Sequence, residues 1–408
     1  MFRSYKVQLN PNQVQISELR KNCGAARWAY NYALNIKLEQ FKNRERISNY
    51  IELCRSLNKL KGTEALPWAY AKGISKFSFQ EALKDCDKAF QNFFTRCKKK
   101  VKGKKGFPKF KSKKNEVHKF RLCDSIHISA SQIKLPRLGR IKLAESNYIP
   151  LEGRILSATV STKANKWFVS VNMEVLDNEP INPINDVIGI DLGIKTLATC
   201  SNGEIFNNPK ALKNNLKRLK RKQRHLSRKK KGSKNREKAR IKLSKLHYHI
   251  SNIRKDCLHK ITSKIIDENQ VIVLEDLKVS NMLKNHKLAQ AISDVGLYEF
   301  RRQITYKAGW NSRKVIFADT FFPSSKQCSC CGWKNSDLKL TDRVFECKVC
   351  DMKIDRDLNA SLNLKQIYTG SSSGIQACGE QSSSNESLVS CSMKQEFNKK
   401  SKDYILKV

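Results

Sequence analysis

The sequence is poor in acidic residues and has no long apolar run. Asp and Glu number 37 against 80 Lys and Arg, a formal net charge of +43 over 408 residues. Self-repulsion on this scale disfavours a compact fold, so we expect the charge to meet a polyanion: DNA, RNA or an anionic membrane. No apolar segment is long enough to span a bilayer, and the start of the chain, Met1–Lys6, does not resemble a signal peptide. We therefore expect a nucleic-acid partner and no membrane.

The plain alternative is a ribosomal or histone-like basic protein. Such proteins are usually short and poor in aromatic residues, whereas this chain has 18 Phe, 11 Tyr and 5 Trp. The length is also enough for several domains and a sizeable buried core. The composition favours a multidomain protein that binds nucleic acid.

A secreted disulfide framework is absent, although the chain has 14 Cys. Four of them form two Cys-x2-Cys pairs, Cys328 with Cys331 and Cys347 with Cys350. Two such pairs complete a tetrahedron of thiolates around zinc, and four protein ligands leave no open position for water. The alternative is four ordinary buried thiols, which the paired spacing disfavours; Cys330 is an extra thiol inside the first pair. We predict a structural zinc site and a reducing, cytoplasmic compartment.

Hydrophobic periodicity divides the chain into segments of different type. The predicted fold is multidomain α+β: a β-barrel with an inserted helical bundle, then an RNase H-like α/β domain with an inserted zinc ribbon. The predicted boundaries are 1–10 and 107–182 for the barrel, 11–106 for the helical domain, 187–320 and 355–368 for the α/β domain, 321–354 for the ribbon and 369–408 for a disordered Ser/Gly-rich tail.

Two acidic residues lie in or at the end of apolar strand patterns. Asp191 lies within Ile188–Lys195, and Glu275 closes Val271–Leu274. A buried carboxylate is costly unless it is paired or binds metal. The alternatives are a structural Asp at a strand bend or a phosphate-binding loop for Asp191, and a solvent-facing strand end for Glu275. Its neighbour Asp276 is expected on the opposite face of the strand.

A third acidic residue, Asp357, lies near the start of a predicted helix, on the face that would pack on a sheet. The alternative is a plain helix cap, since acidic residues favour the first turn; Asp355 precedes the helix and is the weaker candidate. An RNase H-like fold places carboxylates on its first strand, at the end of its fourth and on a late helix. There they hold two divalent cations, and carboxylates suit Mg²⁺.

A dense basic segment separates the first two acids. Lys210–Lys245 contains eighteen Lys and Arg and one acid, Glu237. Two apolar stripes predict an antiparallel helical hairpin over 208–265. A solvated face is the usual interpretation of such charge; its density and single sign favour phosphate binding, with Arg218, Arg221 and Arg228 as candidate contacts.

With these motifs in order, the chain resembles the TnpB family, the OrfB proteins of insertion sequences related to type V CRISPR effectors. The segments that carry the resemblance are Gly24–Asn31, Lys76–Gln80, Gly106–Phe110, Leu135–Gly139, Gly189–Lys195, Phe322–Cys328 and Asp355–Ala360.

The resemblance implies a Mg²⁺-dependent, RNA-guided DNA endonuclease of the prokaryotic cytosol, with a guide RNA from the transposon end and a double-stranded DNA target. It assigns catalysis at one RuvC-like centre to Asp191, Glu275 and Asp357. It also suggests contacts to the target-adjacent motif from Lys76, Phe77 and Gln80. The alternatives are a DNA-binding repressor or accessory transposition protein without cleavage, and a true transposase, which uses the same metal chemistry.

Overall fold

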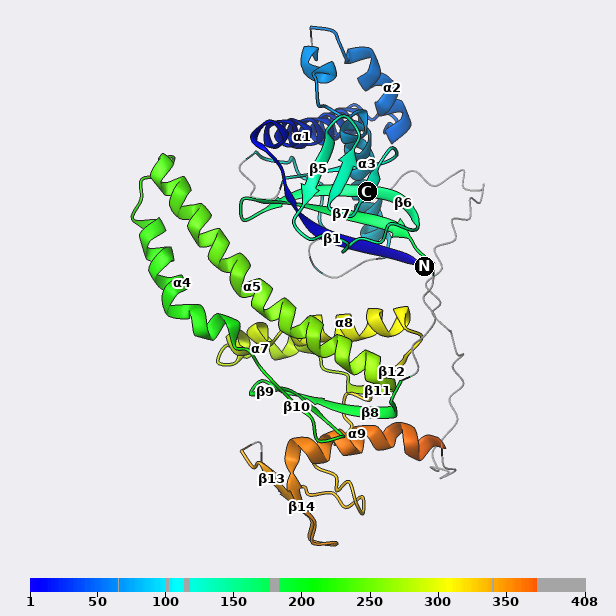
Figure 1. The fold of residues 1–408 in the computed structure, drawn as a ribbon, viewed down its shortest axis with the longest axis vertical. Coiled ribbons are helices and arrows are strands. Elements are labelled where there is room, and N and C mark those ends of the chain that lie inside the picture. Colours follow the sequence, from blue (N-terminus) through cyan, green and yellow to red (C-terminus); the bar gives the residue numbers. More distant parts are fainter. Residues whose placement is uncertain are drawn as a thin grey trace.

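The computed structural model describes residues 1–64, 66–99, 103, 105–113, 118–176, 183–339 and 341–372. The predicted tail from residue 369 lies largely outside these residues. Its first residues belong to the last helix, which continues to Ser372. The described elements form two sheets with helices packed on them, and a small two-stranded ribbon (Figure 1). None of the described helices is long and apolar enough to cross a membrane.

The first sheet has seven strands, and every neighbouring pair in it is antiparallel. The strand order is β2-β6-β7-β1-β5-β4-β3. The strands are β1 (Phe2–Asn10), β2 (Lys119–Leu122), β3 (His127–Ser129), β4 (Gln132–Leu135), β5 (Gly139–Leu143), β6 (Arg154–Lys163) and β7 (Lys166–Glu174). The predicted strands are confirmed, with β1 in the interior of the sheet. A closed barrel is not confirmed, because β2 and β3 stand at the two edges of the described sheet.

The helical block between β1 and β2 packs on this sheet. It comprises α1 (Gln13–Lys42), α2 (Tyr50–Leu60), the 3-10 turn η1 (Pro67–Tyr70) and α3 (Lys76–Lys98). One continuous core contains buried residues of the helices and the sheet, including Leu34, Phe79 and Val169. Buried Asn22 of α1 fixes the start of α3: its amide donates to the Gly73 carbonyl over 2.6 Å, and its oxygen accepts from the Ser75 amide over 3.0 Å.

The second sheet has five strands in the order β10-β9-β8-β11-β12. They are β8 (Asn185–Leu192), β9 (Thr196–Cys200), β10 (Ile205–Asn207), β11 (Asn269–Glu275) and β12 (Lys314–Ala318). The strand β11 runs parallel to β8 and β12, whereas β9 and β10 form an antiparallel meander. The carboxyl ends of β8, β11 and β12 therefore meet at one edge of the sheet.

The helices of this part of the chain are α4 (Ala211–Ser227), α5 (Lys234–Glu268), α6 (Val279–Met282), α7 (Ala289–Val295), α8 (Leu297–Trp310) and α9 (Arg356–Ser372). Figure 1 shows α5 and α8 on one side of the sheet and α9 on the other. One core joins β8 and β11 to α5 and α8, through residues such as Ile272 and Phe300. A second core joins Val273 of β11 to Leu364 of α9, on the opposite face.

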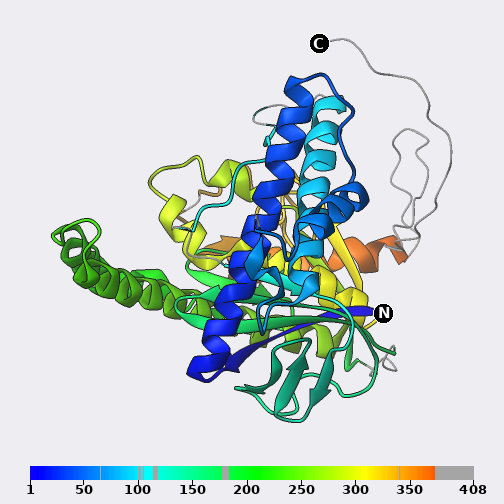
Figure 2. The same ribbon diagram turned by 90° about the horizontal axis from the view of Figure 1, so that it is seen from above.

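The helices α4 and α5 form the predicted basic hairpin. Leu219 of α4 packs with Leu246 and Ile250 of α5. Figure 2 shows the far end of the hairpin projecting away from the rest of the molecule. Basic residues of both helices, such as Arg218, Arg221 and Lys238, are exposed along this arm.

The two-stranded ribbon joins β12 to α9 in the chain. It contains the antiparallel pair β13 (Val344–Glu346) and β14 (Lys353–Asp355), packed around fully buried Phe345. The predicted domain boundaries are not tested by these observations and stay a proposal.

Candidate functional site

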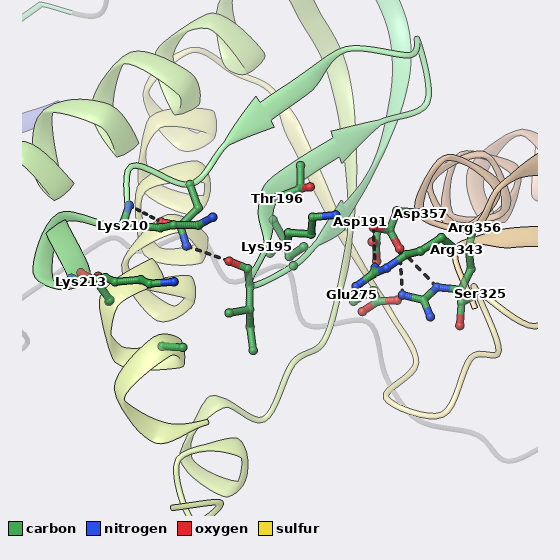
Figure 3. A pocket seen from close by; sticks show the side chains of 16 residues that line it. Asp191, Lys195, Thr196, Lys210, Lys213, Glu275, Ser325, Arg343, Arg356 and Asp357 are labelled. Atoms are coloured by element: carbon green, nitrogen blue, oxygen red, sulfur yellow. Dashed lines mark hydrogen bonds and ion pairs between the residues drawn. The ribbon is translucent and has the colours of Figure 1, made fainter. Parts of the chain in front are cut away.

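The three predicted acids Asp191, Glu275 and Asp357 line one cavity of about 540 Å³ (Figure 3). Asp191 lies near the end of β8, and Glu275 is the last residue of β11. Ile190 pairs with Leu274 in the parallel register, so the two acids that follow them come out at the same edge of the sheet. Asp357 is the second residue of α9. Side chains distant in sequence are thus brought together by strand pairing and helix docking.

A glycine lets α9 approach β8 closely. A Cβ added to Gly189 would lie 2.1 Å from the Ser361 carbonyl oxygen and 2.5 Å from the Lys365 amide nitrogen. These distances are far below van der Waals contact, so only glycine fits. The predicted packing face of α9 is confirmed, because Ser361 and Leu364 are fully buried. Gly189 therefore sets how near Asp357 comes to Asp191.

The surroundings of Asp191 disfavour its ionisation in the absence of a cation. Burial, followed by the charges of Glu275 and Asp357, raises the pKa of Asp191 to about 8. Burial also raises the pKa of Glu275, against the effect of a hydrogen bond from the Ser324 hydroxyl. A divalent cation would neutralise the charges of these carboxylates. The arrangement therefore favours the binding of such an ion.

Two arginines lie beside Asp357. The Arg356 guanidinium is 3.1 Å from its Oδ1, and that of Arg343, from the ribbon, is 3.7 Å from its Oδ2. Both arginines line the cavity. Sequence reasoning did not single them out, because an isolated Arg next to an acid is common on protein surfaces.

Asp355, the weaker candidate, and Asp276, expected on the opposite face of its strand, have other partners. Asp355 caps α9: its Oδ1 accepts from the Asp357 amide over 2.9 Å and from the Leu358 amide over 3.1 Å. Asp276 forms an ion pair with Arg301. The helix-cap alternative weighed for Asp357 therefore applies to Asp355.

Three lysines also line the cavity. Figure 3 shows Lys210 and Lys213 away from the three acids, whereas the Lys195 side chain extends toward Asp191. Buried Asp294 of α7 holds the start of α4 here, because its carboxylate accepts from the Leu212 amide over 2.9 Å. The cavity thus combines three clustered carboxylates with ammonium and guanidinium groups, which suits a metal ion and a phosphate together.

The four cysteines of the ribbon form one cluster. The Sγ atoms of Cys328, Cys331, Cys347 and Cys350 all lie within 4.8 Å of one another. Zinc–sulfur bonds of about 2.3 Å in a tetrahedron place thiolates about 3.8 Å apart. The measured Cys328–Cys350 and Cys331–Cys347 separations of 3.6 and 3.5 Å agree with this geometry. The cluster therefore fits zinc.

The predicted nucleic-acid contacts do not line the carboxylate cavity. Lys76, Phe77 and Gln80 lie together on the first turns of α3, where the Lys76 ammonium is 5.2 Å from the Phe77 ring centre. Arg218, Arg221 and Arg228 are exposed on or just after α4. The structure places them in two separate groups.

A second, larger cavity of about 950 Å³ lies between α1, the first sheet and α5. Its basic side chains include Arg20, Lys21 and Arg27 from α1 and Arg240 from α5. Glu237 is its one acidic lining residue, and it is bound to Arg240 over 2.6 Å. Sequence reasoning missed this cleft, because its walls come from segments far apart in the chain.

Comparison with protein families gives three matches. A family of OrfB proteins of IS605, described as a probable transposase, matches residues 170–286. A domain described as Cas12f1-like TNB matches residues 298–364, which include the cysteine cluster. A domain described as helix-turn-helix matches residues 1–46. In the structure this last range holds β1 followed by the single long helix α1.

Two curated relatives carry the name "Putative RNA-guided DNA endonuclease". One, from Streptomyces pristinaespiralis, is 36% identical over 385 residues, covering 93% of this chain and 91% of the relative. The other, InsQ of Escherichia coli K12, is 32% identical over 396 residues, covering 93% and 94%. A solved structure, the mini-RNA-guided endonuclease CRISPR-Cas_phi3, aligns with 90% of this chain and 92% of its own at 8% identity and a TM-score of 0.48.

Proposed function

Since the chain belongs to the TnpB family, the OrfB proteins of IS605-type insertion sequences, we propose that it is an RNA-guided DNA endonuclease. The two relatives that carry this name are similar over more than nine tenths of both chains. The proposed partners are a guide RNA transcribed from the transposon end and a double-stranded DNA target. Such an activity requires both molecules in one place, so we propose that it operates in the prokaryotic cytosol.

The observation that carries the proposal is the convergence of Asp191, Glu275 and Asp357 in one cavity. They come from the first and fourth strands of the second sheet and from its last helix, the arrangement expected of an RNase H-like, RuvC-type centre. Two bound Mg²⁺ ions would activate a water and stabilise the leaving 3′ oxygen. The three carboxylates, which line one cavity, would hold these ions.

The cationic residues of the cavity have a complementary role in the proposal. Arg343 and Arg356 lie at the acidic end, where each contacts Asp357. Lys195 extends toward Asp191, whereas Lys210 and Lys213 lie at the other end. We propose that Arg343 binds the reacting phosphate and that the lysines bind the phosphates of the same strand, since guanidinium groups bind phosphate oxygens in pairs.

Two basic surfaces outside the cavity support nucleic-acid binding. The cleft between α1 and α5 has basic residues on both walls, and the α4–α5 arm continues the positive charge outward. We propose that they bind the phosphate backbones of guide and target, whereas Lys76, Phe77 and Gln80 contact the target-adjacent motif. Phosphate contacts position a nucleic acid without reading its sequence.

The test is plasmid cleavage by the full-length protein bound to its own RNA, with a guide-matched target and Mg²⁺. We expect Glu275→Ala to abolish cleavage, whereas its neighbour Asp276→Ala, which removes an acid paired outside the cavity, keeps it. Equal cleavage by wild type and Glu275→Ala would contradict the assignment of the centre.

Two other functions remain as alternatives with distinct products. The basic surfaces outside the cavity could serve a repressor or an accessory protein that binds its target without cutting, and persistent binding without cleavage in Mg²⁺ or Mn²⁺ would favour it. The matching family is described as a probable transposase. Joined strand-transfer products in the same assay would favour that function, because hydrolysis and strand transfer differ only in the nucleophile.

A further inference from the structure

The Glu275 carboxylate is oriented by a residue of the segment that leads into the zinc ribbon. The Ser324 hydroxyl donates to its Oε1. Ser324 is only 5% exposed, so water does not compete freely for this hydrogen bond. A hydroxyl bound to one oxygen fixes the rotation of a carboxylate and therefore the direction of its other lone pairs.

Ser324 is in turn held by the last helix. The Asn363 side-chain amide donates to the Ser324 carbonyl over 2.7 Å and to the Gln327 carbonyl over 2.6 Å. Asn359, one turn earlier, donates to the same Gln327 carbonyl over 2.6 Å. Asn359 and Asn363 are buried at 0% and 1% exposure. Two buried amides thus fix the backbone of one short segment, residues 324–327.

The zinc cluster begins where this segment ends. Cys328 follows Gln327 directly and is 1% exposed, and the next amide, of Ser329, donates to Asn359 Oδ1 over 3.0 Å. The backbone that carries the first zinc ligand and the backbone that carries Ser324 are therefore held by the same two asparagines. A displacement of the cysteine cluster would be transmitted to Ser324 within four residues of chain.

We propose that Ser324 is a positioning residue for the divalent-cation site, and that the folded, zinc-loaded ribbon keeps it in place through Asn359 and Asn363. This inference rests on the proposed function, since it assumes that Glu275 binds the cation. The ribbon is then part of the nuclease centre's support as well as a neighbouring module. Its zinc occupancy sets the affinity of a different metal at the three carboxylates.

The experiment measures Mn²⁺ affinity of the full-length protein, freed of nucleic acid, from the electron paramagnetic resonance signal of unbound Mn²⁺. The Asp191→Ala variant provides the signal without the carboxylate site. We expect Ser324→Ala to weaken Mn²⁺ binding roughly tenfold, as the loss of other partners of metal ligands does. Asn363→Ala should weaken it in the same direction with the zinc content unchanged. A zinc-ligand variant, Cys331→Ser, should weaken it as well.

The matched control is Gln366→Ala. Gln366 also ties α9 to the ribbon: its side chain donates over 2.6 Å to the carbonyl of Ser329, which lies outside the segment 324–327. We expect its Mn²⁺ affinity to equal that of wild type. Wild-type affinity in Ser324→Ala would overturn the inference while leaving the metal centre intact. If instead wild type and Asp191→Ala bind Mn²⁺ equally, the carboxylate centre of the proposed function fails together with this inference.

Discussion

Asp191 is the residue whose chemistry depends most on its surroundings. Its carboxyl lies among two other acids, and burial together with their charges holds its pKa near 8, about four units above the ordinary value. A folded-state pKa above the unfolded one means that the fold favours the protonated form. The metal-free protein therefore loses stability from this group as pH rises between about 4 and 8.

Asp191→Asn should consequently stabilise the metal-free fold at high pH while abolishing cleavage. We expect a melting temperature a few degrees above wild type at pH 9, since about 1 kcal/mol corresponds to roughly 2–4 °C in a domain of this size. The difference should shrink toward pH 5, where the wild-type carboxyl is protonated. Thermal melts across this pH range without added divalent cation measure the difference in melting temperature. If the wild type melts at a higher temperature than Asp191→Asn at pH 9, burial of the charged Asp191 carboxylate does not destabilise the fold.

Arg343 offers a second test at this scale. Arg343→Ala should lower the cleavage rate roughly 100-fold, as the loss of a group that stabilises transition-state charge does, with little change in target affinity. Single-turnover cleavage and a binding titration on the same substrate separate the two effects. The control is Arg55→Ala on the exposed side of α2. A loss of binding equal to the loss of rate would assign Arg343 to affinity instead.

At the scale of elements, the site is made by how strands and helices meet. The sequence predicted Asp191, Glu275, Asp357 and the four cysteines because each stands in a short local pattern. Ser324 and Lys195 stood inside segments that carried the family resemblance, yet nothing local shows that they face the acids. Arg343 and the cleft between α1 and α5 depend on the docking of distant segments, which spacing does not encode. Strand periodicity led to the prediction of a barrel. Periodicity does not determine whether the two edge strands of a sheet pair with each other, which is what closes a barrel.

Gly189→Ala tests the docking of α9 on β8. The added methyl would overlap the α9 backbone, so we expect a loss of roughly 1–3 kcal/mol in unfolding free energy, as in other overpacked cores, together with reduced cleavage. Gly309→Ala in α8 is the control, because its Cβ would meet no atom within 4 Å. Chemical denaturation measures the unfolding free energy of both variants. If Gly189→Ala has the unfolding free energy of wild type, α9 can shift away from β8 without cost.

The zinc cluster gives a second prediction for an element. Cys347→Ser should lose zinc and lower the melting temperature, because four thiolates on one ion supply much of the folding energy of so short a module. Cys330→Ser, which removes the exposed thiol outside the cluster, should retain both zinc and stability. Metal analysis and thermal melts give the two readouts. A melting profile unchanged by Cys347→Ser would contradict a structural zinc.

At the scale of the whole molecule, basic residues of α1, such as Arg20 and Arg27, face Arg240 of α5 across one cleft. The cleft between α1 and α5 joins the first sheet's side of the molecule to the nuclease sheet's side. A polyanion bound there would hold the two together, because it replaces repulsion between their basic walls with attraction to shared phosphates.

Arg20→Gln should therefore weaken RNA binding and make it less sensitive to salt. Loss of one phosphate contact lowers the slope of log affinity against log salt by about 1, whatever the RNA sequence. Affinities measured at several salt concentrations give the slope, with Arg55→Gln as the control of equal charge. An unchanged slope would exclude Arg20 from the bound surface.

The position of Asp357 on α9 also bears on the order in which a ribosome makes this protein. The strands that carry the other two acids, the basic arm and the whole first sheet leave the ribosome before α9 does. The cavity is therefore complete only once α9 has been made, because a chain that lacks α9 lacks one of the three carboxylates.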